Sequence, residues 1–200
     1  MKVLVACEFS GRVRDAFTAK GHNAWSCDLL ASETPGQHYK GDVRKILDKG
    51  WDLMIAHPPC TFLCSSGLHW NDRIPERQAR TNLAVEFFLR LWDADIPRIA
   101  VENPVGCMSS ILRKPDQYIQ PWEYGEPETK LTCLWLKNLP LLKPTNIMPL
   151  DNRRTNMNSK GQNKIGDQKD RERTRSLTYN GWAEAFADQW GTEGEQDGIS

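Results

Sequence analysis

Short strand-like runs that each end in a polar or reactive residue are the feature that most constrains how this chain folds. Runs of this length and apolar content are typical of strands buried on both faces of a sheet. They cover residues 3–6 before Cys7, 23–27 before Asp28, 51–56 before His57 and 99–101 before Glu102. Stretches with helical spacing of apolar residues lie between them, at 12–19 and 81–92. The alternation predicts an α/β fold, with a mainly parallel sheet and helices on both faces.

The length of 200 residues fits one ordinary domain with a small appendage. A further strand is expected at 131–136 and a closing helix at 182–190. Residues 151–175 differ, because they hold eight basic and four acidic residues and almost no apolar ones. We therefore expect a catalytic-type domain over 1–150, a basic loop over 151–175, a closing helix of the same domain over 176–191, and a disordered acidic tail over 192–200.

The composition of the chain limits the cellular compartments in which we expect to find it. No stretch approaches the roughly 20 apolar residues that a membrane helix needs. Glu8 arrives too early for the apolar core of a secretory signal. The six cysteines are scattered through apolar segments, which is typical of free and mostly buried thiols. We expect a cytoplasmic protein with no membrane partner.

Polar residues gather where the expected strands end. Ligands of open α/β sheets bind beyond the carboxyl ends of the strands. The residues at those ends are 7–11, Asp28, Gly41-Asp42, 57–60 and Glu102-Asn103. Each of these residues, taken alone, could have a purely structural role, as a helix cap, a turn residue or a packed thiol. Together they predict a ligand site at the edge of the sheet where the strands end.

The same residues resemble the motifs of the DNA cytosine C5 methyltransferases, which use S-adenosylmethionine. In this chain the family's motifs are matched, in order, by Phe9-Ser10-Gly11, Asp28, Gly41-Asp42, Pro58-Pro59-Cys60 with Gly67 beyond it, Glu102-Asn103 and the segment 124–130. The resemblance covers about residues 3–137, with a possible last helix at 181–190. It implies a Rossmann-like class I methyltransferase fold over residues 1–150.

The resemblance also implies roles for these residues. Catalysis would fall to Cys60, Glu102 and Lys130. S-adenosylmethionine would be held by Phe9, Ser10, Gly11, Asp28, Asp42 and Pro58, with Asp28 at the ribose hydroxyls and Asp42 near the adenine amino group. The substrate would be cytosine in DNA, either single-stranded or flipped out of the duplex.

The chemistry of cytosine asks for the same residue types. Carbon 5 is a poor nucleophile, so a thiolate must first add at carbon 6, and cysteine is the side chain most ready to do so. Cys60 would need a positive or hydrogen-bonding neighbour, for which His57 and Lys130 are candidates. A carboxyl group must hold the N3 edge of the base, and Glu102 has the side chain and the strand-end position for it.

The chain also departs from the family pattern. Val13 or Arg14 replaces the second glycine of the first motif, Thr61 replaces glutamine, and Glu128 and Lys130 replace the family's Gln and Arg. The large target-recognition domain is missing. We expect the basic loop to stand in for it, with nucleic acid bound by Arg153, Arg154, Arg171 and Arg173, and by Trp70 in the loop after Cys60.

Several alternatives stay open. A methyltransferase-like domain could bind nucleic acid without turnover, the substrate could be RNA, or the basic loop could be a solvated surface without a partner. His57, Cys60, Cys64 and His69 could hold zinc, although their spacing is not a common frame and we expect no metal. An adenine N6 methyltransferase needs no nucleophilic cysteine, and a zinc deaminase needs a Cys-x-x-Cys motif that this chain lacks.

Overall fold

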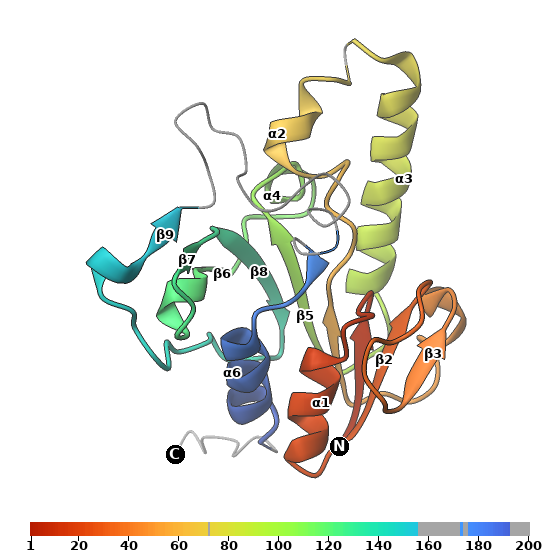
Figure 1. Cartoon of the computed structure of the whole chain (residues 1–200). Helices are drawn as coiled ribbons and strands as arrows, with labels where there is room; N and C mark the ends of the chain where they lie inside the picture. The colour runs from red at the N-terminus through yellow and green to blue at the C-terminus, as the bar shows by residue number, and fades with distance from the viewer. Residues whose placement is uncertain (72, 156–172, 174–175, 193–200) are drawn as a thin grey trace, which may run out of the picture.

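A seven-stranded sheet forms the centre of the computed structural model, which describes residues 1–71, 73–155, 173 and 176–192 (Figure 1). The strands run in the order β3-β2-β1-β4-β5-β8-β6. Their bounds are β1 Lys2–Ala6, β2 Asn23–Asp28, β3 His38–Lys40, β4 Leu53–Ala56, β5 Arg98–Pro104, β6 Gln117–Ile119 and β8 Thr132–Lys137. β3, β2, β1, β4 and β5 are parallel neighbours, whereas β8 is antiparallel to β5 and to β6.

Helices cover both faces of this sheet (Figure 1). α1 (Arg12–Ala19) and α6 (Asn180–Trp190) pack against one face, and α3 (Pro75–Trp92) packs against the other. Shorter elements connect them: η1 Val43–Lys45, α2 Ser65–Leu68, α4 Met108–Ile111, η2 Pro121–Glu123 and η3 Leu150–Asn152. A separate two-stranded sheet pairs β7 (Glu128–Thr129) with β9 (Arg154–Thr155).

Alternation along the central strands builds two cores. In β1, Val3 and Val5 belong to the apolar cluster under α1 and α6, while Leu4 and Ala6 belong to the cluster under α3. Successive side chains of a strand point to opposite faces, so a strand buried on both faces must be apolar throughout. This explains why residues Val3 to Ala6 of β1 and all of β4 are uninterrupted apolar runs with almost no exposure.

The strand order places a topological switch point at the centre of the sheet. From β1 the chain moves outward to β2 and β3, then returns to β4 on the other side of β1. Ligands of such sheets bind where the direction reverses, outside the carboxyl ends of the strands. Here those ends lead into the segments 7–11 and 57–60. The fold is an open, Rossmann-like α/β sheet, mainly parallel and with helices on both faces, as the sequence predicts.

The sequence-based elements differ from the structure in a few places. The helix expected at 81–92 begins already at Pro75, and the strand expected at 131–136 is antiparallel to its neighbours. β5 continues to Pro104, so Glu102 and Asn103 belong to the strand and do not follow it. None of the six cysteines forms a disulfide, but only Cys27 and Cys133 are buried, so the expectation that most are buried is wrong.

The described part of the chain contains no helix that is both long and apolar enough to cross a membrane. Most of the basic loop expected at 151–175 and nearly all of the tail expected at 192–200 lie outside the described residues. The closing helix expected at 182–190 is α6, which begins two residues earlier.

Candidate active site

The Pro58-Pro59-Cys60 turn is fixed by a side chain of the neighbouring strand. The buried amide of Asn103 in β5 donates a hydrogen bond of 2.7 Å to the carbonyl oxygen of Pro58. The carbonyl of Cys60 in turn accepts from the backbone N–H groups of Leu63 and Cys64, each at 3.0 Å. Because prolines donate no backbone hydrogen bond, this turn depends on acceptors and side chains for its anchoring. The structure thus brings the Pro-Pro-Cys and Glu-Asn motifs together.

The loop after Cys60 is joined to the loop after β5. Cys64 and Gly106 form an isolated antiparallel bridge, and the N–H of Cys107 donates to the carbonyl of Leu63 at 2.9 Å. A Cβ atom on Gly106 would lie 2.0 Å from that same carbonyl oxygen. The two backbones approach so closely that only glycine fits at this position.

His57 and Glu102 form a buried pair across β4 and β5. Nδ1 of His57 lies 3.0 Å from Oε2 of Glu102, and their side chains are 9% and 13% exposed. Burial acts to raise the pKa of Glu102, but the hydrogen bond from His57 and the charges of Lys130 and His57 outweigh it and hold that pKa below its ordinary value. The other oxygen of Glu102, Oε1, and Nε2 of His57 are buried without a hydrogen-bond partner among the described residues.

Lys130 lies between this pair and the start of α6. Its ammonium nitrogen is 5.8 Å from the ring centroids of both Tyr179 and Trp182. The hydroxyl of Tyr179 donates to Glu128 at 3.0 Å. The segment 124–130 is therefore joined to the first turn of α6, a contact that sequence reasoning missed because the two segments are about 50 residues apart.

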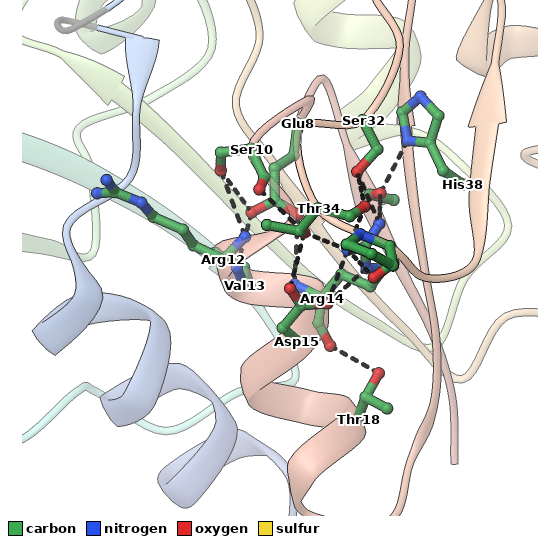
Figure 2. Close-up of polar contacts among 12 residues, drawn as sticks. Glu8, Ser10, Arg12, Val13, Arg14, Asp15, Thr18, Ser32, Thr34 and His38 are labelled. Carbon is green, nitrogen blue, oxygen red and sulfur yellow. Dashed lines mark hydrogen bonds and ion pairs between the residues drawn. The ribbon is translucent and has the colours of Figure 1, made fainter.

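Glu8 occupies the N-terminus of α1 (Figure 2). Its carboxylate accepts from the backbone N–H of Val13 at 2.7 Å and of Arg14 at 3.3 Å, and from the hydroxyl of Ser10 at 3.2 Å. A helix N-terminus favours an anion, and here the anion is supplied by the chain itself. Burial raises the pKa of Glu8, although these hydrogen bonds and the charge of His57 oppose the rise. From the sequence, Glu8 was expected only as one of the strand-end residues 7–11, without a separate role.

Arg14, one of the two residues expected at a glycine position of the first motif, is fully buried. Its guanidinium donates to the hydroxyls of Ser26, Ser32 and Thr34 at 3.1, 3.0 and 2.6 Å, and it pairs with Asp15 at 2.7 Å (Figure 2). These partners tie the loop after β2 to α1. Gly11 sits against the same group, since a Cβ atom there would lie 2.4 Å from the Arg14 guanidinium. The positive φ of 78° at Gly11 is a second reason for glycine.

The residues expected to bind the cofactor lie along this edge. Phe9, Ser10 and Gly11 form the turn from β1 to α1, and Asp28 ends β2. One carboxylate oxygen of Asp28 accepts from the N–H of Leu30 at 2.9 Å, and Leu29 and Leu30 beside it are exposed apolar residues. Asp42 instead caps η1 and binds the guanidinium of Arg44 at 2.6 Å, and this hydrogen bond lowers its pKa.

These observations test how S-adenosylmethionine would fit. A carboxylate at the end of β2, flanked by exposed leucines, suits a ribose and an adenine ring. The N–H groups that open α1 are taken by Glu8, so they do not offer an anion site to the amino-acid part of the cofactor. The nucleoside half of the cofactor fits, whereas its carboxylate would need other donors.

The residues expected to contact nucleic acid are more scattered. Trp70 is 43% exposed, with the guanidinium of Arg73 at 5.4 Å from its ring centroid. Arg153 lies 3.5 Å from the ring centroid of Trp122, and Arg173 pairs with Glu33 at 2.7 Å. The backbone of Arg154 belongs to β9, and Arg171 lies outside the described residues. Within the described residues, no group of three or more His, Cys, Asp or Glu side chains could hold a metal ion.

The chain matches no protein-family model, and no curated protein is similar to it in sequence. Among solved structures, it is similar to a prophage-encoded Escherichia coli protein described as a DNA modification methyltransferase, with a TM-score of 0.46 and 14% identity over 74% of this chain and 52% of that one. A 16S rRNA methylase, RmtB, has a TM-score of 0.32 and 14% identity over 68% of this chain and 55% of that one. The chain thus spans about half the length of these two proteins.

Proposed function

We propose that this chain transfers a methyl group from S-adenosylmethionine to carbon 5 of cytosine in DNA, through a covalent adduct on Cys60. One observation carries the proposal. The segment that holds Cys60 and the strand that holds Glu102 are joined by two hydrogen bonds, from Asn103 to Pro58 and from His57 to Glu102. A nucleophile and a carboxylate are thereby held at the carboxyl ends of adjacent parallel strands.

Each residue has a separate task in this reaction. The thiolate of Cys60 forms a bond to carbon 6, and the ring electrons shift toward carbon 5. Glu102 accepts a hydrogen bond from the 4-amino group beside N3 of the base, and the charge of Lys130 supports its carboxylate. When bound, S-adenosylmethionine supplies the methyl group that carbon 5 accepts. Loss of the carbon 5 proton to a base then expels the Cys60 thiolate and restores the aromatic ring.

The cofactor would lie along Phe9, Ser10, Gly11 and Asp28, with Asp42 and Pro58 at its edges. Asp28 supports this assignment best, because its carboxylate ends β2 beside the exposed Leu29 and Leu30. Asp42 would have to bind adenine while it keeps its hydrogen bonds to Arg44. The base would enter single-stranded or flipped, with Trp70 and the basic residues Arg153, Arg154, Arg171 and Arg173 as contacts.

Covalent trapping tests the reaction. An oligonucleotide that contains 5-fluorocytosine should form a stable adduct in the presence of S-adenosylmethionine, because carbon 5 then has no proton to lose. Cys60→Ser should form none, since a serine hydroxyl is scarcely ionised at neutral pH. Cys64→Ser is the matched control, four residues further along the same loop, and should trap at the wild-type rate. Adduct formation by Cys60→Ser would refute the assignment.

A second function is favoured by the first motif. Glu8 fills the α1 N-terminus and Arg14 fills the space of a glycine, so the turn is stabilised by internal groups. A methyltransferase-like domain that binds nucleic acid without turnover would need no more than this. Such a domain would bind oligonucleotides with an affinity that adenosylhomocysteine does not change, and it would trap no 5-fluorocytosine.

A further inference from the structure

We propose that His57 is a positioning residue for Glu102, which reserves a single carboxylate oxygen for the substrate base and so restricts the site to bases that donate a hydrogen bond there. This inference rests on the proposed function, and it assigns a task to a residue that the motif resemblance leaves without one. His57 directly precedes Pro58-Pro59-Cys60, so the same turn carries the nucleophile and the residue that orients its partner.

The hydrogen bond fixes the two oxygens of Glu102 in different roles. Oε2 accepts from Nδ1 of His57 at 3.0 Å, whereas Oε1 is buried and has no partner among the described residues. An ionised carboxylate is only an acceptor, so Nδ1 of His57 carries the proton. A buried acceptor without a partner destabilises the site, and a bound ligand that donates to Oε1 removes that penalty.

The surroundings of the pair favour the acceptor state of Glu102. Lys130 contributes positive charge, and the second carboxylate near His57 is Glu8, which is buried at the start of α1. Cys133, opposite Asn103 in β8, has its pKa raised to about 11 by burial and by the charge of Glu102, so it remains a neutral thiol. Among the described residues, Lys130, Glu8 and Cys133 thus act on the pair from the segments that precede β8, follow β1 and form β8.

This arrangement predicts which bases are accepted. Cytosine carries a 4-amino group, which is a donor, and Glu or Asp side chains accept from it. Uracil and thymine carry an oxygen at that position, which would face Oε1 as a second acceptor. A site built around one hydrogen bond rejects an analogue that cannot form it by about 10⁴-fold or more. Without His57 the carboxylate can rotate, and this discrimination should weaken.

Two substitutions distinguish the effect of the hydrogen bond to Glu102 from the effect of the imidazole ring itself. His57→Ala removes the donor, while His57→Asn keeps an amide N–H close to the position of Nδ1. His22→Asn is the matched control, because His22 precedes β2 at the opposite edge of the sheet. If His57 merely supported packing, both substitutions at position 57 would act on stability and leave the titration of Glu102 unchanged.

The first measurement is independent of turnover. Carbon-13 labelling of glutamate carboxyls, with the Glu102 signal identified by its loss in Glu102→Gln, gives the pKa of Glu102 directly. We expect His57→Ala to raise this pKa, because burial is then no longer offset by the hydrogen bond. His57→Asn should raise it less, and His22→Asn should not change it. An unchanged Glu102 titration in His57→Ala overturns the proposal.

The second measurement is the rate of trapping by oligonucleotides that contain 5-fluorocytosine or 5-fluorouracil. His57→Ala should slow the 5-fluorocytosine reaction about 10²-fold, as expected for a misplaced catalytic group, and lower its preference over 5-fluorouracil. His57→Asn should restore most of both. Equal slowing of the two bases by His57→Ala would overturn the specificity role. If the wild type traps neither base while the titration shifts as expected, the proposed reaction fails but His57 still positions Glu102.

Discussion

The buried side-chain amide of Asn103 donates a hydrogen bond of 2.7 Å to the carbonyl oxygen of Pro58. With the His57–Glu102 hydrogen bond, this contact joins two motifs that are about 45 residues apart in the sequence. It also explains why an asparagine follows Glu102, since aspartate could not donate to the carbonyl. The position of Cys60 therefore depends on a residue of the next strand.

We expect Asn103→Ala to lower the free energy of unfolding by about 1–3 kcal/mol, because it leaves the Pro58 carbonyl without a partner in a buried place. Urea denaturation measures this loss. Asn138→Gly is the control: its amide makes a similar bond to the carbonyl of Pro97, but in an exposed position and at a positive φ that glycine tolerates. A loss in Asn103→Ala no larger than in the control would contradict the anchoring role.

Arg14 should be among the costliest side chains to remove. Arg14→Met keeps much of the volume but leaves Ser26, Ser32 and Thr34 without their shared donor. Removing one partner of a buried charged network costs about 3 kcal/mol or more. Thermal and urea unfolding should show this, while Lys20→Ala, which breaks the exposed pair with Asp188, should cost less than about 1 kcal/mol. Equal effects would contradict the network.

Glu8 should make stability fall as pH rises. Burial raises its folded pKa above the ordinary 4.5, so the stability that its protonated form contributes is complete below about pH 4.5 and is lost as pH climbs through the folded value. Glu8→Gln can still accept from Val13 but does not titrate. The unfolding free energy of the wild type relative to Glu8→Gln should therefore decrease with pH, by up to about 1.4 kcal/mol per unit within that window. Parallel pH profiles would contradict this.

Asp28 should contribute to cofactor affinity. Calorimetry with adenosylhomocysteine should show about tenfold weaker binding for Asp28→Ala, a loss of about 1.4 kcal/mol. Asp52→Ala is the control, because Asp52 precedes β4 at the other edge of the sheet, where it accepts from the N–H of Lys2 at 2.7 Å. Equal affinities for Asp28→Ala and the wild type would remove Asp28 from the site.

The basic residues are expected to bind phosphates. Replacing Arg153, Arg154, Arg171 and Arg173 by alanine should flatten the log–log salt dependence of duplex binding by up to about four times 0.9. Arg173 is paired with Glu33, so a phosphate would have to displace that carboxylate. Arg90→Ala on the exposed side of α3 serves as the control. An unchanged slope would mean that the basic segment is a solvated surface.

The sequence predicts the central strands well, because each of β1, β4 and β5 holds an apolar run of three or four residues that is buried on both faces. It does not predict β3 or β6, which have three residues each and little apolar character. The sequence could not predict that β8 is antiparallel either, since an apolar run looks the same for a parallel and an antiparallel strand. The position of Cys60 and Glu102 near the expected strand ends made them candidate site residues. In the structure, hydrogen bonds join the segments that hold them.

What the sequence could not supply are contacts between distant side chains. His57 was a candidate helper for Cys60, yet its Nδ1 faces Glu102. Arg14 entered the sequence-based expectation only with Val13, as a possible replacement of a glycine, although its guanidinium holds the loop after β2. Both depend on which groups lie opposite one another, and no periodicity in the chain encodes this. The one sequence signal for the Arg14 network was an arginine near a position where a small residue is expected.

The packing of α1 against α6 has a consequence for how the chain folds during synthesis. Phe17 and Val13 of α1 share an apolar cluster with Trp182 and Phe186, which are made about 170 residues later. Until α6 leaves the ribosome, α1 alone covers that face of the nascent sheet, and the rest of its apolar surface is open to chaperones and to wrong partners. The last helix thus acts as the closing step, and a chain stopped before residue 180 should be recovered mainly as aggregate.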